Sequence, residues 1–519
     1  MTHHHSSPEA KSGRTQLGGY GLAVFAIVLV LPRMLRIAYP QVWIEDESYL
    51  NGAFMISQGG QPYIDFPLPH FPLVDILLAG VFFIFGASIQ TAELLTQSVV
   101  FACSAIVFAL GKRLGGIVCG ITAAIIFAFS SLLFRYHVFE REIYLLLPIL
   151  AANWLALDLC GTRKGSKSLS VCIGILLWMA IMCKLTAVAH ITAVLSFVAI
   201  RSKRKYEVVM IGFTVVMLSS VTFTSLYGIY GEPLLVQVFL FRICHAGFYT
   251  LTERIELLRQ TMDVSLVLGL FGGITALWNR QWRTWVLPLC QVGCVVFFMV
   301  ILNHTLWPHN VIELLPWLCV FGGQFVSSMV KDAMRNRKLS WRTGISAAVV
   351  VLLLIFVIPL INAHWGDQPK RVYGLGYMPR KEIADMADYV RMHAPVETPV
   401  VVPPIIAFQA NRIEWIPYPE LAGTIMELQA QVNRKGLLGA VQSCTISERD
   451  FWENVAMSRR SWLPQLEQDI AAGRVPLVIN FSPHELFPVM LFDFPDTYLQ
   501  RHGYQLGHVT PSHRAWIRQ

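Results

Sequence analysis

The segment IEDESYLNGAFMISQGGQPYIDFPLPHFP, residues 44–72, directly follows the first apolar stretch of the chain. It opens with three consecutive acids, Glu45, Asp46 and Glu47, and closes with a proline-rich run that begins at Pro67. Carboxylates beside a membrane-length apolar segment are costly to remove from water, so they are typically functional. We therefore begin the search for a site at the end of this first apolar stretch.

The composition indicates an integral membrane protein. Hydrophobic residues make up 55% of the chain and charged residues only 14%, whereas soluble domains carry about 25% charged residues. The net charge of +8 does not indicate a nucleic-acid partner, because Lys and Arg occur as short clusters between apolar runs. Clusters at such places set membrane topology.

Apolar runs of membrane-spanning length predict about eleven spans. With that number, every basic cluster falls on the side of the N-terminus, which the positive-inside rule assigns to the cytoplasm. We therefore expect a multi-pass protein of the inner (plasma) membrane with its C-terminus periplasmic or extracellular. The predicted spans cover roughly 19–38, 93–111, 115–134, 143–160, 168–183, 185–200, 207–227, 264–278, 284–302, 311–329 and 343–362.

The segment 71–88 is apolar but is not counted as a span. It is short, contains Asp75, and is bracketed by Pro72 and Gly86. A span here would move Lys112 to the outer side and break the charge alternation. We expect a helix at the outer interface instead.

This topology gathers charged residues on one outer face. The acids of the first loop meet a second acidic loop that contains Glu140 and Glu142. Acids beside cations suit a reaction between an anionic lipid and a hydroxyl or amine acceptor, because a carboxylate can accept the proton while cations stabilise a departing phosphate. The cations and histidines on this face include Lys184, Arg242, His245 and His309.

The order of these motifs resembles the GT-C superfamily of membrane glycosyltransferases, in particular its protein O-mannosyltransferase and aminoarabinose transferase branches, which use polyprenyl-phosphate sugars. The first loop carries the resemblance through Asp46-Glu47-x-Tyr49 and Gly60-x-Pro62-Tyr63-x-Asp65. The similarity extends over roughly 15–330. Its later landmarks are Glu142-Ile-Tyr-Leu-Leu-Leu, Met182-Cys-Lys184-Leu-Thr186 and the stretch from Pro308-His309-Asn310 to Pro316.

The resemblance implies roles for individual residues. Asp46 matches the first-loop catalytic acid and would be the general base, with Glu47 as its helper. Glu142 matches the second-loop acid, with Glu140 as the alternative register, and Lys184 matches a lysine near the donor phosphate. The full set is Asp46, Glu47 and Glu142 as catalytic residues and Tyr63, His70, Glu140, Lys184, Arg242, His245 and His309 as substrate-binding residues.

The resemblance leaves the metal requirement open. In some branches the second acid helps to hold a divalent metal ion, which here would lie between Asp46 and Glu142. However, the second acid is Glu where Asp is commoner, and His70-Phe71-Pro72 stands where some branches carry an acidic-Lys-Pro triplet.

The residues 363–519 are expected to form a separate α/β domain outside the membrane, after a GT-C type transmembrane catalytic domain at 1–362. Helical patterns at Arg380–His393 and Trp462–Ala472 alternate with strand-like runs at Pro399–Ile406 and Val475–Phe481. Only Cys444 of the ten cysteines falls in this part, which excludes a disulfide within it.

The predicted function is transfer of a sugar from a polyprenyl-phosphate donor to a periplasmic glycolipid, glycan or protein by inverting displacement, with Asp46 as base. The alternative is a transporter or flippase of lipid-linked or anionic substrates, which would need ionisable groups near mid-membrane; Asp75 and Glu313 come closest to this requirement. A third reading is a membrane scaffold that displays the outer domain. The sugar, the acceptor and the oligomeric state stay open.

Overall fold

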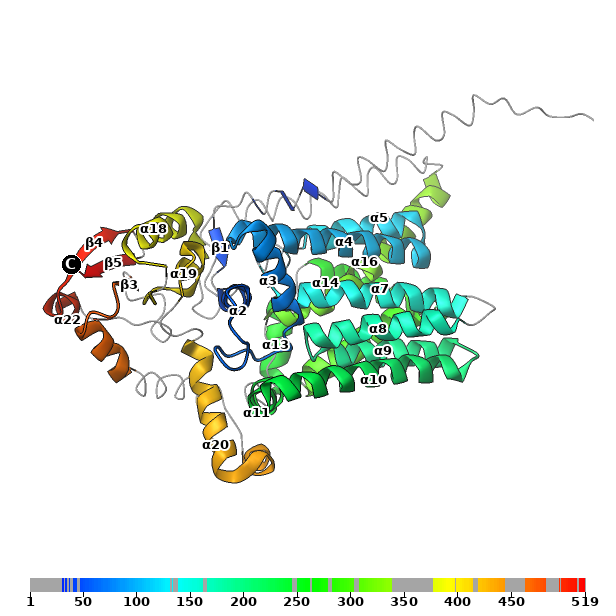
Figure 1. Cartoon of the computed structure of the whole chain (residues 1–519). Helices are drawn as coiled ribbons and strands as arrows, with labels where there is room; N and C mark the ends of the chain where they lie inside the picture. The colour runs from blue at the N-terminus through cyan, green and yellow to red at the C-terminus, as the bar shows by residue number, and fades with distance from the viewer. Residues whose placement is uncertain are drawn as a thin grey trace, which may run out of the picture.

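A computed structural model gives the fold of the chain (Figure 1). The predicted spans 19–38 and 343–362 lie wholly or largely outside the residues that the structure describes, as do Asp46 and His245. The described residues are 30–31, 33–34, 37, 41–43, 47–130, 133, 139–161, 166–244, 250–261, 264–278, 282–302, 308–337, 377–396, 398–413, 419–443, 463–481, 494, 496–510 and 513–518.

Apolar helices packed side by side form the body of the protein (Figure 1). Among the described residues, four helical stretches are long and apolar enough to cross a membrane: 89–115, 141–161, 205–230 and 283–302. The helices of the bundle are α4 (Ile89–Gly115), α5 (Ile117–Ala128), α7 (Arg141–Gly161), α8 (Lys167–Cys183), α9 (Ala187–Arg201), α10 (Lys205–Tyr230), α14 (Val264–Trp278), α15 (Trp282–Phe297) with its π-helical continuation η3 (Phe298–Leu302), and α16 (Leu315–Arg337).

Glycines let these helices approach closely. A Cβ atom on Gly272 of α14 would lie 1.8 Å from the carbonyl oxygen of Phe321 on α16. A Cβ on Gly323 of α16 would lie 2.4 Å from the carbonyl oxygen of Cys119 on α5. Small residues at such crossings are how helices pack in a membrane, where tight contact must replace the hydrophobic effect.

The segment 71–88 forms a helix across the end of the bundle. Helix α3 (Leu73–Phe85) has only 13 residues, or about 20 Å of length, and it crosses the direction of the bundle helices (Figure 1). This geometry agrees with the expected interfacial helix. Phe83, Ile84 and Phe85 are 84%, 69% and 74% exposed, while Asp75 is fully buried.

The remaining short elements before the C-terminal part lie at this same end of the bundle (Figure 1). Their position follows from the chain path, since α7 and α9 begin here and α8 and α10 end here. They are β1 (Gln41–Trp43), α2 (Glu47–Ser57), α11 (Glu232–Leu235), the π-helix η2 (Val236–Leu240), α12 (Phe241–Cys244), α13 (Leu251–Thr261) and the 3-10 helix η4 (Pro308–Glu313).

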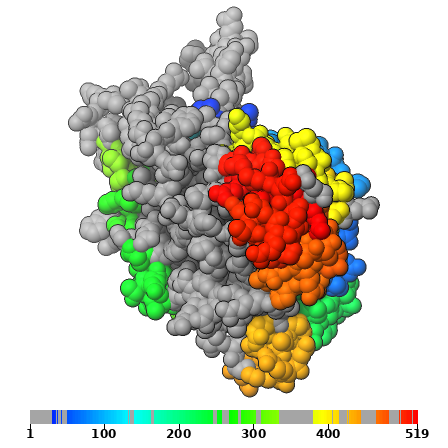
Figure 2. Space-filling view, turned by 90° about the vertical axis from the view of Figure 1, so that its left-hand side faces the viewer, coloured from blue at the N-terminus to red at the C-terminus, as the bar shows by residue number. Residues whose placement is uncertain are grey.

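The C-terminal part is an α/β unit, and it covers this end of the bundle (Figures 1 and 2). The predicted helix 380–393 is confirmed, and residues 463–471 are helical. Strands β3, β5 and β4 form an antiparallel sheet in that order. The elements are β2 (Tyr377–Pro379), α18 (Arg380–His393), α19 (Pro404–Ala410), α20 (Pro419–Ser443), β3 (Leu477–Phe481), α22 (Asp496–Arg501), β4 (Tyr504–Val509) and β5 (His513–Arg518).

The prediction of a strand at Pro399–Ile406 is wrong. Val401 makes an isolated β-bridge to Val478 of β3, Val400 is likewise in a bridge and not in a strand, and helix α19 begins at Pro404. The pair Pro403-Pro404 explains the change, because proline removes a ladder donor from a strand but is well accommodated in the first turn of a helix.

Candidate functional site

Glu140 and Glu142 lie at the start of α7, at the end of the bundle beside the C-terminal part. Glu142 belongs to the first helical turn and Glu140 directly precedes the helix. The helix dipole favours negative charge at this position. Both side chains are nonetheless buried, Glu140 at 0% and Glu142 at 1% exposure, so they need partners within the protein.

Lys184 and Asn310 are partners of Glu142. Lys184 is the C-cap residue of α8, in the tight connection to α9, and its ammonium group forms a buried ion pair with Glu142. The amide of Asn310 donates a hydrogen bond of 2.7 Å to Glu142 Oε1. The predicted lysine of the hairpin and the predicted second acid are therefore in direct contact.

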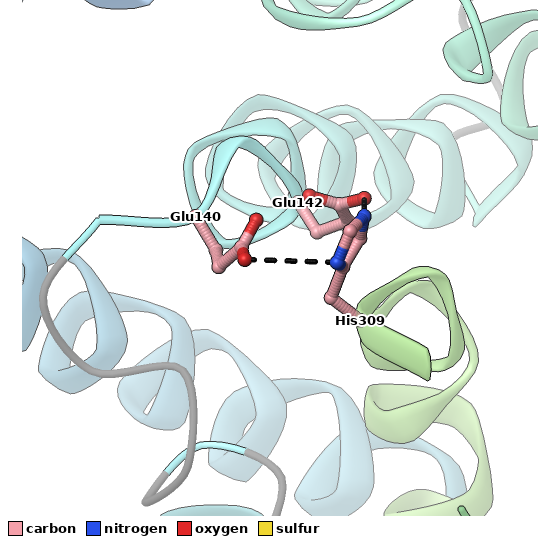
Figure 3. Close-up of side chains that lie close together, drawn as sticks. All are labelled: Glu140, Glu142 and His309. Atoms are coloured by element: carbon pink, nitrogen blue, oxygen red, sulfur yellow. Dashed lines mark ion pairs between the residues drawn. The ribbon is translucent and has the colours of Figure 1, made fainter. Parts of the chain in front are cut away.

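His309 lies between the two acids (Figure 3). Its Nδ1 is 3.6 Å from Glu140 Oε1 and its Nε2 is 3.5 Å from Glu142 Oε1. One ligand atom from each of these three side chains lies within 4.8 Å of the other two. Two carboxylates and an imidazole are ligands that suit a divalent ion such as Zn²⁺. The described trio differs from the predicted pair of metal ligands, Asp46 and Glu142, because Asp46 lies outside the described residues.

Arg141, between the two acids in sequence, points to a different partner. Its Nη2 is 2.6 Å from Asp75 Oδ1 of α3, and its Nη1 donates a 3.2 Å hydrogen bond to the carbonyl of Phe71. The pair is almost fully buried. Arg141 thus holds the interfacial helix and the end of the proline-rich run against the start of α7.

Tyr63, His70 and Arg242 form a second group of predicted residues. Tyr63 has a left-handed backbone with φ of 69°, which is uncommon for a bulky residue and indicates a constrained loop. Its hydroxyl donates a 2.5 Å hydrogen bond to the carbonyl of His70. Gln237 of η2 fixes the same loop by donating 2.9 Å to the carbonyl of Tyr63 and accepting 2.7 Å from the amide of Leu68.

Arg242 of α12 contacts the ring of His70, with Nη2 2.7 Å from His70 Nε2. Burial is the main cause that lowers the pKa of His70 well below its usual value, and the charge of Arg242 adds to it. His70 is thus neutral and can accept the hydrogen bond from the guanidinium group. Burial likewise raises the pKa of the Tyr63 hydroxyl, which therefore acts as a donor.

The structure brings together most of the predicted residues that it describes. Glu140, Glu142, Lys184 and His309 form one cluster, and Tyr63, His70 and Arg242 form a second group. Glu47 begins α2, and nothing is described of its side chain. Sequence reasoning did not identify Asn310, Gln237 or Arg141 as functional, although Asn310 follows His309 directly and Arg141 lies between the two acids.

Comparison with known proteins gives a consistent result. The family of dolichyl-phosphate-mannose-protein mannosyltransferases matches residues 67–227. A comparison with curated protein sequences found no match. ArnT from Cupriavidus metallidurans bound to undecaprenyl phosphate is similar in structure, with a TM-score of 0.57 at 12% identity over 95% of this chain and 97% of that one.

Two structures from Archaeoglobus fulgidus are also similar. One is the oligosaccharyltransferase AglB in complex with an inhibitory peptide and a dolichol-phosphate, with a TM-score of 0.52 at 12% identity over 89% of this chain and 73% of that one. The other is an oligosaccharyltransferase in complex with Zn and sulfate, with a TM-score of 0.50 at 12% identity over 89% and 67% of the two chains.

These identities are low enough that the structural matches establish the fold alone. That fold is the predicted one, a polytopic helical membrane protein with a small C-terminal sheet, and this prediction is confirmed. The sequence match covers residues 67–227. This range contains the proline-rich run that begins at Pro67, the second acidic loop and Lys184. The resemblance to GT-C membrane glycosyltransferases is thus supported by the family match over residues 67–227 and by the shared fold.

Proposed function

We propose that the protein transfers a sugar from a polyprenyl-phosphate donor to an acceptor at the outer face of the inner membrane. The observation that carries the proposal is the buried cluster of Glu140, Glu142, Lys184 and His309 at one end of the helix bundle. Buried charges at the edge of a membrane bundle are costly and typically serve a substrate. The proposal places the N-terminus in the cytoplasm, residues 1–362 in the membrane domain and 363–519 in the periplasm.

The structural relatives support the class of donor. Two proteins of the same fold were solved with undecaprenyl phosphate and with a dolichol-phosphate. Both are long prenyl chains that end in a phosphate. In this chain, the prenyl tail would lie along the bundle helices while the phosphate reaches the cluster.

The charge of the cluster favours a cation. Glu140 and Glu142 carry two negative charges, and Lys184 supplies one positive charge. The neighbouring Arg141 is already neutralised by Asp75. A divalent metal ion would balance the negative charge that remains among these three side chains.

A divalent ion fits the ligand atoms of Glu140, Glu142 and His309, and a relative of the same fold was solved with Zn. Such an ion would supply positive charge to the phosphate oxygens of the donor. The metal requirement is part of the proposal and is tested below.

In the proposed reaction, the acceptor oxygen or nitrogen attacks the anomeric carbon from the face opposite the phosphate. Asp46 takes the acceptor proton as general base, with Glu47 beside it. The bond between the anomeric carbon and the phosphate oxygen breaks, and the phosphate leaves with the electron pair. Lys184 and Arg242 stabilise the charge of the departing phosphate, so the sugar is transferred with inversion.

The test separates donor binding from chemistry. With purified protein, undecaprenyl phosphate binding and transfer from an undecaprenyl-phosphate-linked sugar are measured for Asp46→Asn, Glu142→Gln and Lys184→Ala. We expect Asp46→Asn to keep lipid binding but to lower transfer by about 100-fold or more, the size of a general-base contribution. Lys184→Ala is expected to weaken lipid binding.

Lys205→Ala is the matched control, because Lys205 begins α10 at the opposite end of the bundle. Removal of metal ions with a chelator, followed by addition of Zn²⁺, Mn²⁺ or Mg²⁺, tests whether transfer requires a divalent metal ion. Full transfer by Asp46→Asn would remove the proposed base. Movement of the intact lipid-linked sugar across vesicles without cleavage would support a transporter instead.

A further inference from the structure

A chain of buried polar side chains runs through the helix bundle outside the cluster described above. It begins at Asn153 on α7 and continues through Gln291 on α15 to His190 on α9 and Glu313 at the end of η4. All four side chains are at most 1% exposed. Polar and ionisable groups at such positions are expensive in a membrane, so the chain needs an explanation.

The hydrogen bonds between these polar side chains all run in one direction, from donor to acceptor. The Asn153 amide nitrogen donates to the carbonyl of Ile149 at 2.7 Å. Gln291 Nε2 donates to Asn153 Oδ1 at 2.8 Å, which leaves Gln291 Oε1 as an acceptor. His190 Nδ1 lies 2.7 Å from this oxygen and must therefore carry a proton.

His190 Nε2 then faces the carboxylate of Glu313. The distance from Nε2 to Oε2 is 3.3 Å. The two side chains are thus within ion-pair distance of each other. The other carboxyl oxygen, Oε1, accepts a 2.6 Å hydrogen bond from the hydroxyl of Thr186. Glu313 is thus held at both oxygens by residues at the start of α9.

Glu313 is the last residue of η4, the short helix that begins at Pro308. The same helix carries His309 and Asn310, which contact Glu142. Thr186 lies two residues after Lys184, the ion-pair partner of Glu142. Residues at the start of α9 therefore contact one end of η4 at Glu313, while His309 and Asn310 at the other end contact Glu142.

We propose that His190 and Glu313 are positioning residues that fix η4, and with it His309 and Asn310, against Glu142. They do not touch the cluster themselves, and they act on it through the backbone of η4. The expected effect on kcat rests on the proposed function. The expected effect on the position of η4 does not.

Among the described residues, the other end of this row of polar side chains offers no group that titrates. Beyond His190 the chain consists of Gln291 and Asn153, whose amides do not titrate. The described polar chain thus ends within the bundle, which suits a fixed support and not a conduction path.

The first test compares Glu313→Gln with Glu313→Ala. The amide of the Glu313→Gln variant can accept from Thr186 and donate to His190 Nε2, so it keeps both contacts without a charge. We expect it to keep kcat within about threefold of the wild type, whereas Glu313→Ala lowers kcat about 100-fold, the loss that a misplacement of about 1 Å can cause. KM for the donor should change little in either variant.

A second measurement is independent of catalysis. Hydrogen exchange of peptides covering 308–318 should be slow in the wild type and in Glu313→Gln, and at least about tenfold faster in Glu313→Ala, because the anchor of η4 is lost. If the wild type shows no transfer, the proposed function fails while this measurement still tests the anchor.

Thr186→Val and Thr96→Val form a matched control pair. Both remove a buried or half-buried hydroxyl group, but Thr96 bonds to the Tyr144 hydroxyl whereas Thr186 bonds to Glu313 of η4. We expect faster exchange of 308–318 only in Thr186→Val.

Unchanged exchange and kcat in Glu313→Ala would overturn the proposal. An equal loss of kcat in Glu313→Gln and Glu313→Ala, with slow exchange in both, would also overturn it, because charge and not position would then matter.

Discussion

The two acidic loops of the site are supported by different parts of the molecule. The second loop, with Glu140 and Glu142, is fixed by the ends of the bundle helices, through Lys184 of the α8–α9 connection and Asn310 of η4. The first loop is flanked by β1 and α2, which pack against the C-terminal part. Strand β1 pairs with β2, and Phe54 of α2 contacts Phe408 of α19 at a ring-centroid distance of 5.9 Å.

We infer from this difference that the C-terminal part supports the first loop in addition to covering the bundle. Glu45 and Asp46 lie between β1 and α2 in the sequence and Glu47 begins α2, so we expect a displacement of the C-terminal part to affect these acids. The described contacts of Glu142 in the second cluster come instead from the membrane helices and η4. Variants of the C-terminal part should therefore affect the base more than the donor site.

The largest effect is expected for Phe408→Ala. The ring of Phe408 is fully buried and also contacts Phe82 of α3 at 5.4 Å, so its loss should destabilise the protein by about 3–5 kcal/mol. Transfer should fall while binding of undecaprenyl phosphate is retained. Thermal unfolding in detergent and lipid binding measure the two effects. Phe494→Ala, in the separate core under the C-terminal sheet, is the control, and an equal loss of transfer there would contradict the comparison.

The next largest effect is expected for a disulfide bond that would join the C-terminal part to the helix bundle. Cys244 is disulfide-bonded, eight other cysteines are free thiols, and the remaining one, Cys444, lies outside the described residues. Helix α20, which ends at Ser443, packs on η2 and α12 through Leu428 and Val432. We predict that Cys444 is the partner of Cys244.

Loss of this disulfide should cost about 2–4 kcal/mol. Cys244→Ser should lower the unfolding temperature, and peptide mapping without reductant should find the cross-link. Cys172→Ser, at an exposed free thiol, should change neither. A free Cys244 in protein isolated from the membrane would show the prediction to be wrong.

The ion pair between Glu93 and Arg380 should contribute less. It joins the first turns of α4 to the start of α18, with Glu93 fully buried and Arg380 partly exposed. Arg380→Ala leaves the Glu93 charge without its ion-pair partner and should cost about 1–3 kcal/mol. Glu93→Gln, combined with Arg380→Ala, should recover part of this loss, because the buried charge is removed. A double variant less stable than Arg380→Ala alone would contradict this reading.

The smallest expected effect is a pH dependence from His70. Its pKa in the folded state lies well below 6.5 because of burial, so the unfolded chain binds a proton that the folded one does not. The stability is therefore present at neutral pH and is lost as the pH falls below about 6.5, by about 1 kcal/mol at pH 5.5. Thermal unfolding of His70→Asn should lack this component, whereas that of exposed His393→Asn should keep it.

The helical membrane fold and the residues of the second cluster could be predicted from the amino-acid sequence. Apolar length predicted the helices, since a membrane excludes unpaired backbone groups. Charge alternation predicted an interfacial helix at 71–88, and the short helix α3, which crosses the direction of the bundle helices, agrees with it. The same reasoning put Glu140, Glu142, Lys184 and His309 on one face, because it needed only the direction in which each helix crosses.

Only the tertiary structure decided which side chains meet. The contact of Glu142 with Asn310 joins residues 168 positions apart, and the pairing of β1 with β2 brings Val42 opposite Met378. The directional chain from Asn153 to Glu313 was likewise hidden, because each member is an isolated polar residue within an apolar run. Local patterns fix the helices and their order, whereas the partner of a buried polar group depends on how those helices pack.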